Sequence, residues 1–102
     1  MLNVVQMVQA SRILQHYGID NQVEKAIEEL AECIVALVKR DVEATPGEIA
    51  DVYITLEQVV KGMGIWTEVS EQIQFKLARQ EGRMNSEVKR EKDLEAVKGN
   101  YV

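Results

Sequence analysis

Acidic side chains recur at helical spacing in two short segments of this chain of 102 residues. The first segment has the pattern E-E-x-x-E and contains Glu28, Glu29 and Glu32. The second has the pattern E-x-x-D and runs from Glu48 to Asp51. Side chains three residues apart lie on neighbouring turns of one helix face. The first segment can therefore direct Glu29 and Glu32 to one point, and the second can do the same with its two acids.

Four carboxylates that face one groove repel one another strongly unless a cation neutralises them. The set formed by Glu29, Glu32, Glu48 and Asp51 offers oxygen ligands and neither Cys nor His. Such a set favours Mg²⁺, with Mn²⁺ as a substitute, and Mg²⁺ takes phosphate oxygens as further ligands. The pattern therefore predicts a triphosphate site. The alternative is a solvated acidic helix face, because glutamate is a good helix former and the chain is acidic.

The elements that must position these acids are helices. With 46% hydrophobic residues, 5% aromatic residues and one Pro, the composition favours an all-α protein. We expect a helical bundle of four to five helices, in which residues 1–85 form one domain and residues 86–102 form a charged tail or helix. The helices predicted within the domain cover residues 2–16, 21–40, 45–61 and 67–80.

Capping residues predict where the second and third helices begin. Thr45, Pro46 and Glu48 give the clearest signal, with a capping hydroxyl, a proline at the first helical position and an acid in the first turn. Asn21 and Glu24 form a similar capping pair for the second helix. The link between the two helices is short, so we expect them to pack antiparallel and to bring both acidic segments to one groove.

Charge and composition exclude several classes of protein. The net charge is −5 and no basic face lies outside the last third, which argues against a nucleic-acid polymer or an anionic membrane as partner. No run of 18 apolar residues could span a membrane. The single cysteine, Cys33, excludes an internal disulfide, and the first residues lack the features of a signal peptide. We therefore expect a cytoplasmic protein.

The small size of the chain favours self-association. A single domain of this length buries only about 60–70% of the surface that its unfolded chain exposes. A second copy of the chain can complete such a core, so we expect a homo-oligomer.

The order of the two acidic motifs, joined by residues 33–47, resembles the MazG-like superfamily of all-α nucleoside triphosphate pyrophosphohydrolases. The resemblance covers about residues 17–84 and is greatest to the compact single-domain members that bacteria and their phages carry. It implies Mg²⁺-dependent hydrolysis of a (deoxy)nucleoside triphosphate to monophosphate and pyrophosphate, for nucleotide-pool cleaning or balance, by a dimer or tetramer. The metal ligands that it implies are Glu29, Glu32, Glu48 and Asp51, and the catalytic residues are Glu28, Glu29 and Glu32.

A triphosphate substrate requires further side chains. Lys76, Arg79 and Arg83 lie on one face of the fourth predicted helix and can balance the charge of the phosphates. The alternative for this stripe is an exposed basic face. Lys25, one turn before the acids, and Gln22, which precedes the first motif, are further candidates for substrate binding.

Two other functions stay open on the sequence. One is a non-catalytic helical module of the same fold that binds a nucleotide or a host protein, with the charged tail as its interaction arm. The other is a phosphoribosyl-ATP pyrophosphohydrolase, which uses similar motifs. The segment from Glu48 to Leu56 is more similar to the MazG-like pattern, which favours the first family.

Overall fold

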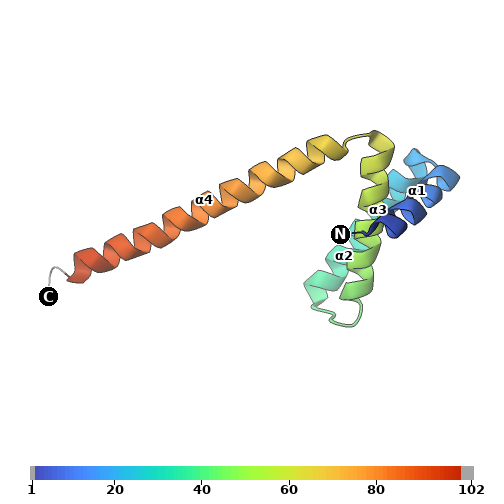
Figure 1. The fold of residues 1–102 in the computed structure, drawn as a ribbon. Coiled ribbons are helices and arrows are strands. Elements are labelled where there is room, and N and C mark those ends of the chain that lie inside the picture. Colours follow the sequence, from blue (N-terminus) through green and yellow to red (C-terminus); the bar gives the residue numbers. More distant parts are fainter. Residues whose placement is uncertain (1, 100–102) are drawn as a thin grey trace. The chain divides into compact units, whose positions relative to one another are not determined.

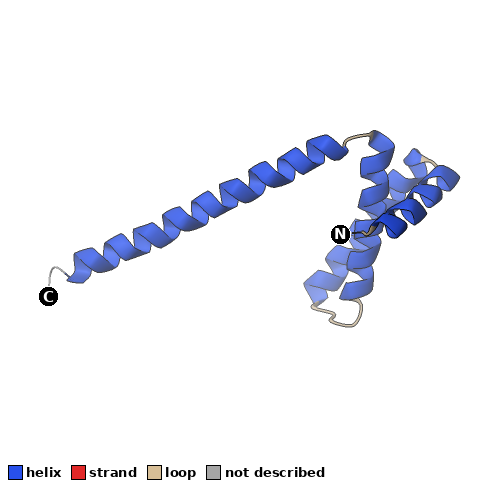
Figure 2. Ribbon diagram, in the orientation of Figure 1, coloured by secondary structure: helices blue, strands red, loops and turns tan. Residues whose placement is uncertain are grey.

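The computed structural model describes residues 2–99, and these form four helices and no strand (Figure 2). The helices are α1 (Val4–Tyr17), α2 (Ile19–Lys39), α3 (Thr45–Met63) and α4 (Trp66–Gly99) (Figure 1). The predicted all-α class is thereby confirmed. None of the described helices is both long enough and apolar enough to cross a membrane.

The chain divides into two compact units, one up to Trp66 and the other from Thr67 onward. The first unit holds α1, α2 and α3, and the second holds α4, a helix of 34 residues, from its second residue onward. The sequence predicts a helix end near residue 80, but α4 continues through Gly82 and Ser86 without a break. A helix tolerates an isolated glycine at a cost of about 1 kcal/mol. The charged segment after residue 85 is therefore helical as far as residue 99.

Gly18 separates α1 from α2 without a linker. Its φ is 86°, a backbone conformation that glycine adopts without strain. Because α2 begins directly afterwards at Ile19, the capping pair predicted at Asn21 and Glu24 is wrong. The side-chain amide of Asn21 instead donates to the carbonyl oxygen of Tyr17 at 2.7 Å.

The start of α3 lies one residue earlier than the capping pattern predicts. Thr45 is already helical and Ala44 is the N-cap residue. A carboxylate oxygen of Asp41 accepts a hydrogen bond from the backbone N–H of Ala44 at 3.0 Å. The hydroxyl of Thr45 donates to the carbonyl oxygen of Asp41. The short link between α2 and α3 is thus fixed by its own hydrogen bonds.

Helices α2 and α3 pack side by side as an antiparallel pair, and α1 packs against both (Figure 1). The interior of this unit is built from small apolar and polar side chains. Small side chains allow close approach of the helices and leave space between them for polar groups. The buried apolar residues are Ala10, Leu14, Ala26, Cys33 and Ala36.

Many large apolar side chains of the helix pair lie on its outside. In α2, Ile27 is 62% exposed and Ile34 is 60% exposed. At about 100° per residue, they lie about a quarter turn from the buried side of the helix. The large apolar side chains of α3 likewise follow its buried residues by about one position. In an antiparallel pair, this offset turns the apolar side chains of both helices toward the same side. We call this surface the apolar face: Ile27, Leu30, Ile34 and Leu37 of α2, with Val52, Leu56, Val59 and Met63 of α3.

Candidate metal centre and adjoining cavity

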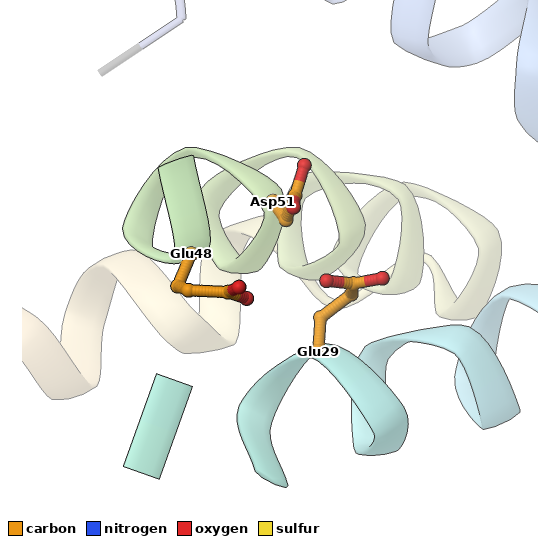
Figure 3. Close-up of side chains that lie close together, drawn as sticks. All are labelled: Glu29, Glu48 and Asp51. Carbon is orange, nitrogen blue, oxygen red and sulfur yellow. The ribbon is translucent and has the colours of Figure 1, made fainter. Parts of the chain in front are cut away.

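Three of the predicted acids meet between α2 and α3. Glu29 extends from α2 toward Glu48 and Asp51 on α3 (Figure 3). One carboxylate oxygen of each residue lies within 4.8 Å of the corresponding oxygens of the other two. Helix geometry explains the cluster, because Glu48 and Asp51 lie on neighbouring turns and the antiparallel packing sets Glu29 opposite them.

Two oxygens of this cluster are buried without a partner. Glu29 is 5% exposed, and its Oε2 accepts no hydrogen bond within the described residues. The Oε2 of Glu48 is in the same state. Leaving a buried acceptor unpaired costs about 1–3 kcal/mol, and more when the group is charged. A hard divalent cation supplies what these oxygens lack, so the three carboxylates fit Mg²⁺ or Mn²⁺.

Lys25 provides a positive charge at the edge of the cluster. Its Nζ lies 3.1 Å from Oε1 of Glu29 and 3.6 Å from Oε2 of Glu28. The hydrogen bond to Glu29, together with the charges of Glu28 and Glu29, raises the pKa of Lys25 above its ordinary value. One ammonium group cannot neutralise three clustered carboxylates. The predicted binding residue Lys25 thus lies at the site but leaves the cluster negative.

Glu32 and Glu28 lie beside the cluster rather than in it. Glu32 is exposed, and its carboxylate is not among the three that converge. The negative charge of Glu29 is the largest cause that raises the pKa of Glu32, followed by partial loss of hydration and by the charges of Glu48 and Glu28. The structure therefore brings together three of the four predicted metal ligands, and places the fourth within their field.

A cavity of about 490 Å³ adjoins the acidic cluster. Its size lies within the usual range for small-molecule sites. Two of the acids form part of its wall, and both substrate-binding candidates of α2 contribute to the same wall. The lining residues are Ile13, Tyr17, Asn21, Gln22, Lys25, Glu29, Asp51, Ile54, Thr55 and Gln58.

A buried pair of amides forms the end of the cavity away from the acids. Gln58 is 2% exposed, and its Nε2 donates to the carbonyl oxygen of Ala10 at 3.2 Å. The Nε2 of Gln22 donates to Oε1 of Gln58 at 2.6 Å. Gln58 is not among the residues that the sequence predicts for the site. Its position seven residues after Asp51 was the available signal, because this spacing returns to the same helix face.

The predicted phosphate-binding residues lie on α4, in the second unit. Arg79 and Arg83 line a shallow hollow along this helix together with Arg90. The guanidinium of Arg79 also lies over the ring of Phe75, at 5.7 Å from its centre. Lys76 is exposed. The role of these cations at the acidic cluster stays a prediction.

No protein-family model, curated protein or solved structure matches the chain. The fold and the site define a helical protein with three converging carboxylates beside a cavity. The resemblance to MazG-like enzymes stays a prediction that rests on the motifs.

Binding of Mn²⁺ tests the candidate centre. We expect calorimetry to detect Mn²⁺ binding to the parent protein and a loss of at least about tenfold in affinity for Glu29→Gln, because an amide offers one neutral oxygen in place of a carboxylate. Glu24→Gln is the matched control, since Glu24 is an exposed acid of the same helix. Equal Mn²⁺ affinity in the two variants would show that the clustered carboxylates do not form the site.

The raised pKa of Glu32 makes the stability of the metal-free protein depend on pH. The folded chain binds this proton more tightly than the unfolded chain, so the stabilisation is full below the ordinary glutamate pKa and is lost as pH rises through the raised value. Glu32→Gln cannot ionise. In buffer with a chelator it should raise the melting temperature at about pH 7.5, and this gain should shrink at about pH 4.

Thermal unfolding of the parent and the variant at both pH values gives the measurement, with Glu24→Gln as the control that should show no such pH-dependent gain. An equal gain for Glu32→Gln at the two pH values would mean that its neighbours do not affect its ionisation.

Proposed function

We propose that this chain is a MazG-like, Mg²⁺-dependent hydrolase that converts (deoxy)nucleoside triphosphates to monophosphate and pyrophosphate. The observation that carries the proposal is the cluster of three carboxylates, which has two buried and unpartnered oxygens and of which two members, Glu29 and Asp51, line a cavity. Such a reaction serves nucleotide-pool cleaning or balance, and its substrates belong to the cytoplasm.

Charge supports a phosphate ligand together with a divalent cation. A triphosphate alone would be repelled by Glu29, Glu48 and Asp51, and these acids alone repel one another. A cation held by the three carboxylates removes both conflicts, because it can accept phosphate oxygens as further ligands. When bound, Mg²⁺ polarises phosphoryl oxygens and lowers the pKa of a coordinated water.

The acids beside the cluster suit proton transfer. Glu32 is exposed and its pKa is raised, so it takes up a proton more readily than an ordinary glutamate. A general base works best when its pKa approaches the working pH. The resemblance to MazG-like enzymes makes Glu32 a catalytic residue in this proposal, and its place in the field of the clustered acids suits that role. Glu28 contacts Lys25 and thereby helps to hold that cation at the edge of the cavity.

Lys25 is the cation that lines the cavity and so can contact a phosphate group directly. A triphosphate carries more negative charge than Lys25 and one divalent cation neutralise. Lys76, Arg79 and Arg83 of α4 are the predicted source of the remaining positive charge.

Release of pyrophosphate tests the reaction. With Mg²⁺ present, we expect release from at least one member of a panel of dNTPs and NTPs. Asp51→Asn should lower kcat by about a hundredfold or more, because it removes an anionic ligand from the centre. Asp20→Asn is the matched control, since Asp20 is an exposed aspartate in the first turn of α2.

Full activity in Asp51→Asn would refute the ligand assignment. If the protein binds nucleotides but releases pyrophosphate from none of the substrates tested, the non-catalytic module is favoured instead.

We further propose that a second copy of the chain covers the apolar face. Its residues include Ile27, Ile34 and Met63, each more than half exposed, on neighbouring helices. Contiguous apolar surface of this kind marks an interface in soluble proteins. A two-fold axis that lies in the plane of the contact sets the same face against itself, so that one surface serves both partners. The occupant is therefore another copy of this chain, in a dimer or tetramer.

Sedimentation measures this association. We expect Ile34→Glu to shift the parent protein from a dimer or tetramer to a smaller species, because it places a charge in the apolar face. Val42→Glu is the control, since Val42 is 83% exposed in the link between α2 and α3 and lies outside that face. A parent protein that sediments as a monomer would contradict the proposal.

A further inference from the structure

We propose that Gln58 is a positioning residue for ligand recognition. It fixes the side-chain amide of Gln22 so that the oxygen of Gln22 accepts a hydrogen bond from an N–H group of a nucleobase in the cavity. This inference rests on the proposed function, because it takes the ligand of the cavity to be a nucleotide.

The backbone of α1 determines the orientation of both amides. The carbonyl oxygen of Ala10 can only accept a hydrogen bond, so the group of Gln58 that faces it must be the NH₂. The oxygen of Gln58 then lies on the other side of its amide and can only accept. The group of Gln22 that contacts this oxygen must likewise be its NH₂. Neither amide can reverse without setting two acceptors or two donors against each other.

The chain of hydrogen bonds ends on an open acceptor. Within residues 2–99, Oε1 of Gln22 accepts no hydrogen bond, yet it is not among the buried oxygens that lack a partner, such as Oε2 of Glu29. It is therefore accessible, although the residue as a whole is 6% exposed. Gln22 lines the cavity, so this oxygen is available to a ligand there.

The spacing along the helices suits a nucleotide between the amides and the acids. Gln22 precedes Glu29 by seven residues on α2, and Gln58 follows Asp51 by seven residues on α3. Two turns of an α-helix span about 10 Å, so the amide pair and the acidic cluster lie that far apart along the same helix pair. The phosphates of a nucleotide at the acidic end then place its base toward the amide end.

The wall between these ends suits the faces of a base. Ile13 and Tyr17 of α1 and Ile54 of α3 contribute apolar and aromatic surface to the cavity. Flat apolar surface contributes affinity, and the amide oxygen contributes orientation and selectivity. If a base offered only an acceptor to this oxygen, neither the acceptor of the base nor the oxygen of Gln22 would have a donor. Such a pair is strongly disfavoured once the bound base shields it from water.

Binding of nucleoside monophosphates, the products of the proposed reaction, tests the inference without turnover. The probes are dAMP against N6,N6-dimethyl-dAMP, and dTMP against N3-methyl-dTMP, each titrated by calorimetry with Mg²⁺ present. Methylation removes the N–H groups from which the oxygen of Gln22 would accept a hydrogen bond. Of dAMP and dTMP, one will bind the parent protein more tightly. We expect the protein to bind that nucleotide at least about tenfold more tightly than its methylated form.

Two variants separate hydrogen bonding from the bulk of the added methyl groups. Gln22→Leu removes the acceptor and keeps the bond between Gln58 and Ala10, and Gln58→Leu removes the group that orients Gln22. In both variants the preference should fall to about threefold or less, with the lost affinity confined to the unmethylated ligand. The double variant Gln22→Leu with Gln58→Leu leaves no unpaired amide, so it serves where the single Gln58 variant does not fold.

An unchanged preference in folded Gln22→Leu, no preference in the parent protein, or no binding of any monophosphate would overturn the inference. Pyrophosphate release by the parent protein is measured separately. Release without a preference against methylated bases would retain the proposed function and reject the role of Gln58. A preference without release would retain the binding role and reject the hydrolysis.

Discussion

The negative charge held between α2 and α3 is the constraint on which the rest of the first unit depends. Glu29, Glu48 and Asp51 converge in a packed helix interface, where water cannot solvate every oxygen. Charged groups that lose hydration in this way must find a partner or remain protonated. Lys25 compensates part of the charge from the rim. The helix pair is therefore built around a group of acids whose charge Lys25 alone does not balance.

This constraint also explains why the unit is apolar on the outside. Placing acids and amides in the interface requires small neighbours, and Ala26, Cys33 and Ala36 of α2 provide them. The larger apolar side chains of α2, such as Ile27 and Ile34, are consequently displaced to the apolar face. Burial of those side chains normally supplies most of the stability of a small domain. The proposed association with a second copy would bury those side chains.

The sequence allowed prediction of the acids because their convergence follows from local geometry. Two pairs at three-residue spacing and a short link were enough to bring Glu29 to Glu48 and Asp51. Glu32 departs from the prediction because it lies about 60° around the helix from Glu29, and only packing decides which side faces α3. The start of α2 was misplaced because a side-chain cap was expected at Asn21, whereas the N-cap residue is Gly18 and makes no side-chain hydrogen bond. Gln58 was missed because its two hydrogen-bond partners, Gln22 and Ala10, lie 36 and 48 residues earlier in the chain.

Helix α1 completes the cavity that adjoins the acids. The acids and the amides occupy the same faces of α2 and α3, two turns apart, so the packing that aligns one set aligns the other. Helix α1 adds Ala10, whose carbonyl gives the amide pair its direction, and Tyr17, which forms part of the cavity wall. A shift of α1 would change the walls of the cavity and the orientation of Gln22 together, while leaving the acids in place. Under the proposed function, the charged end of a nucleotide would lie at the helix pair and its base at the contact between that pair and α1.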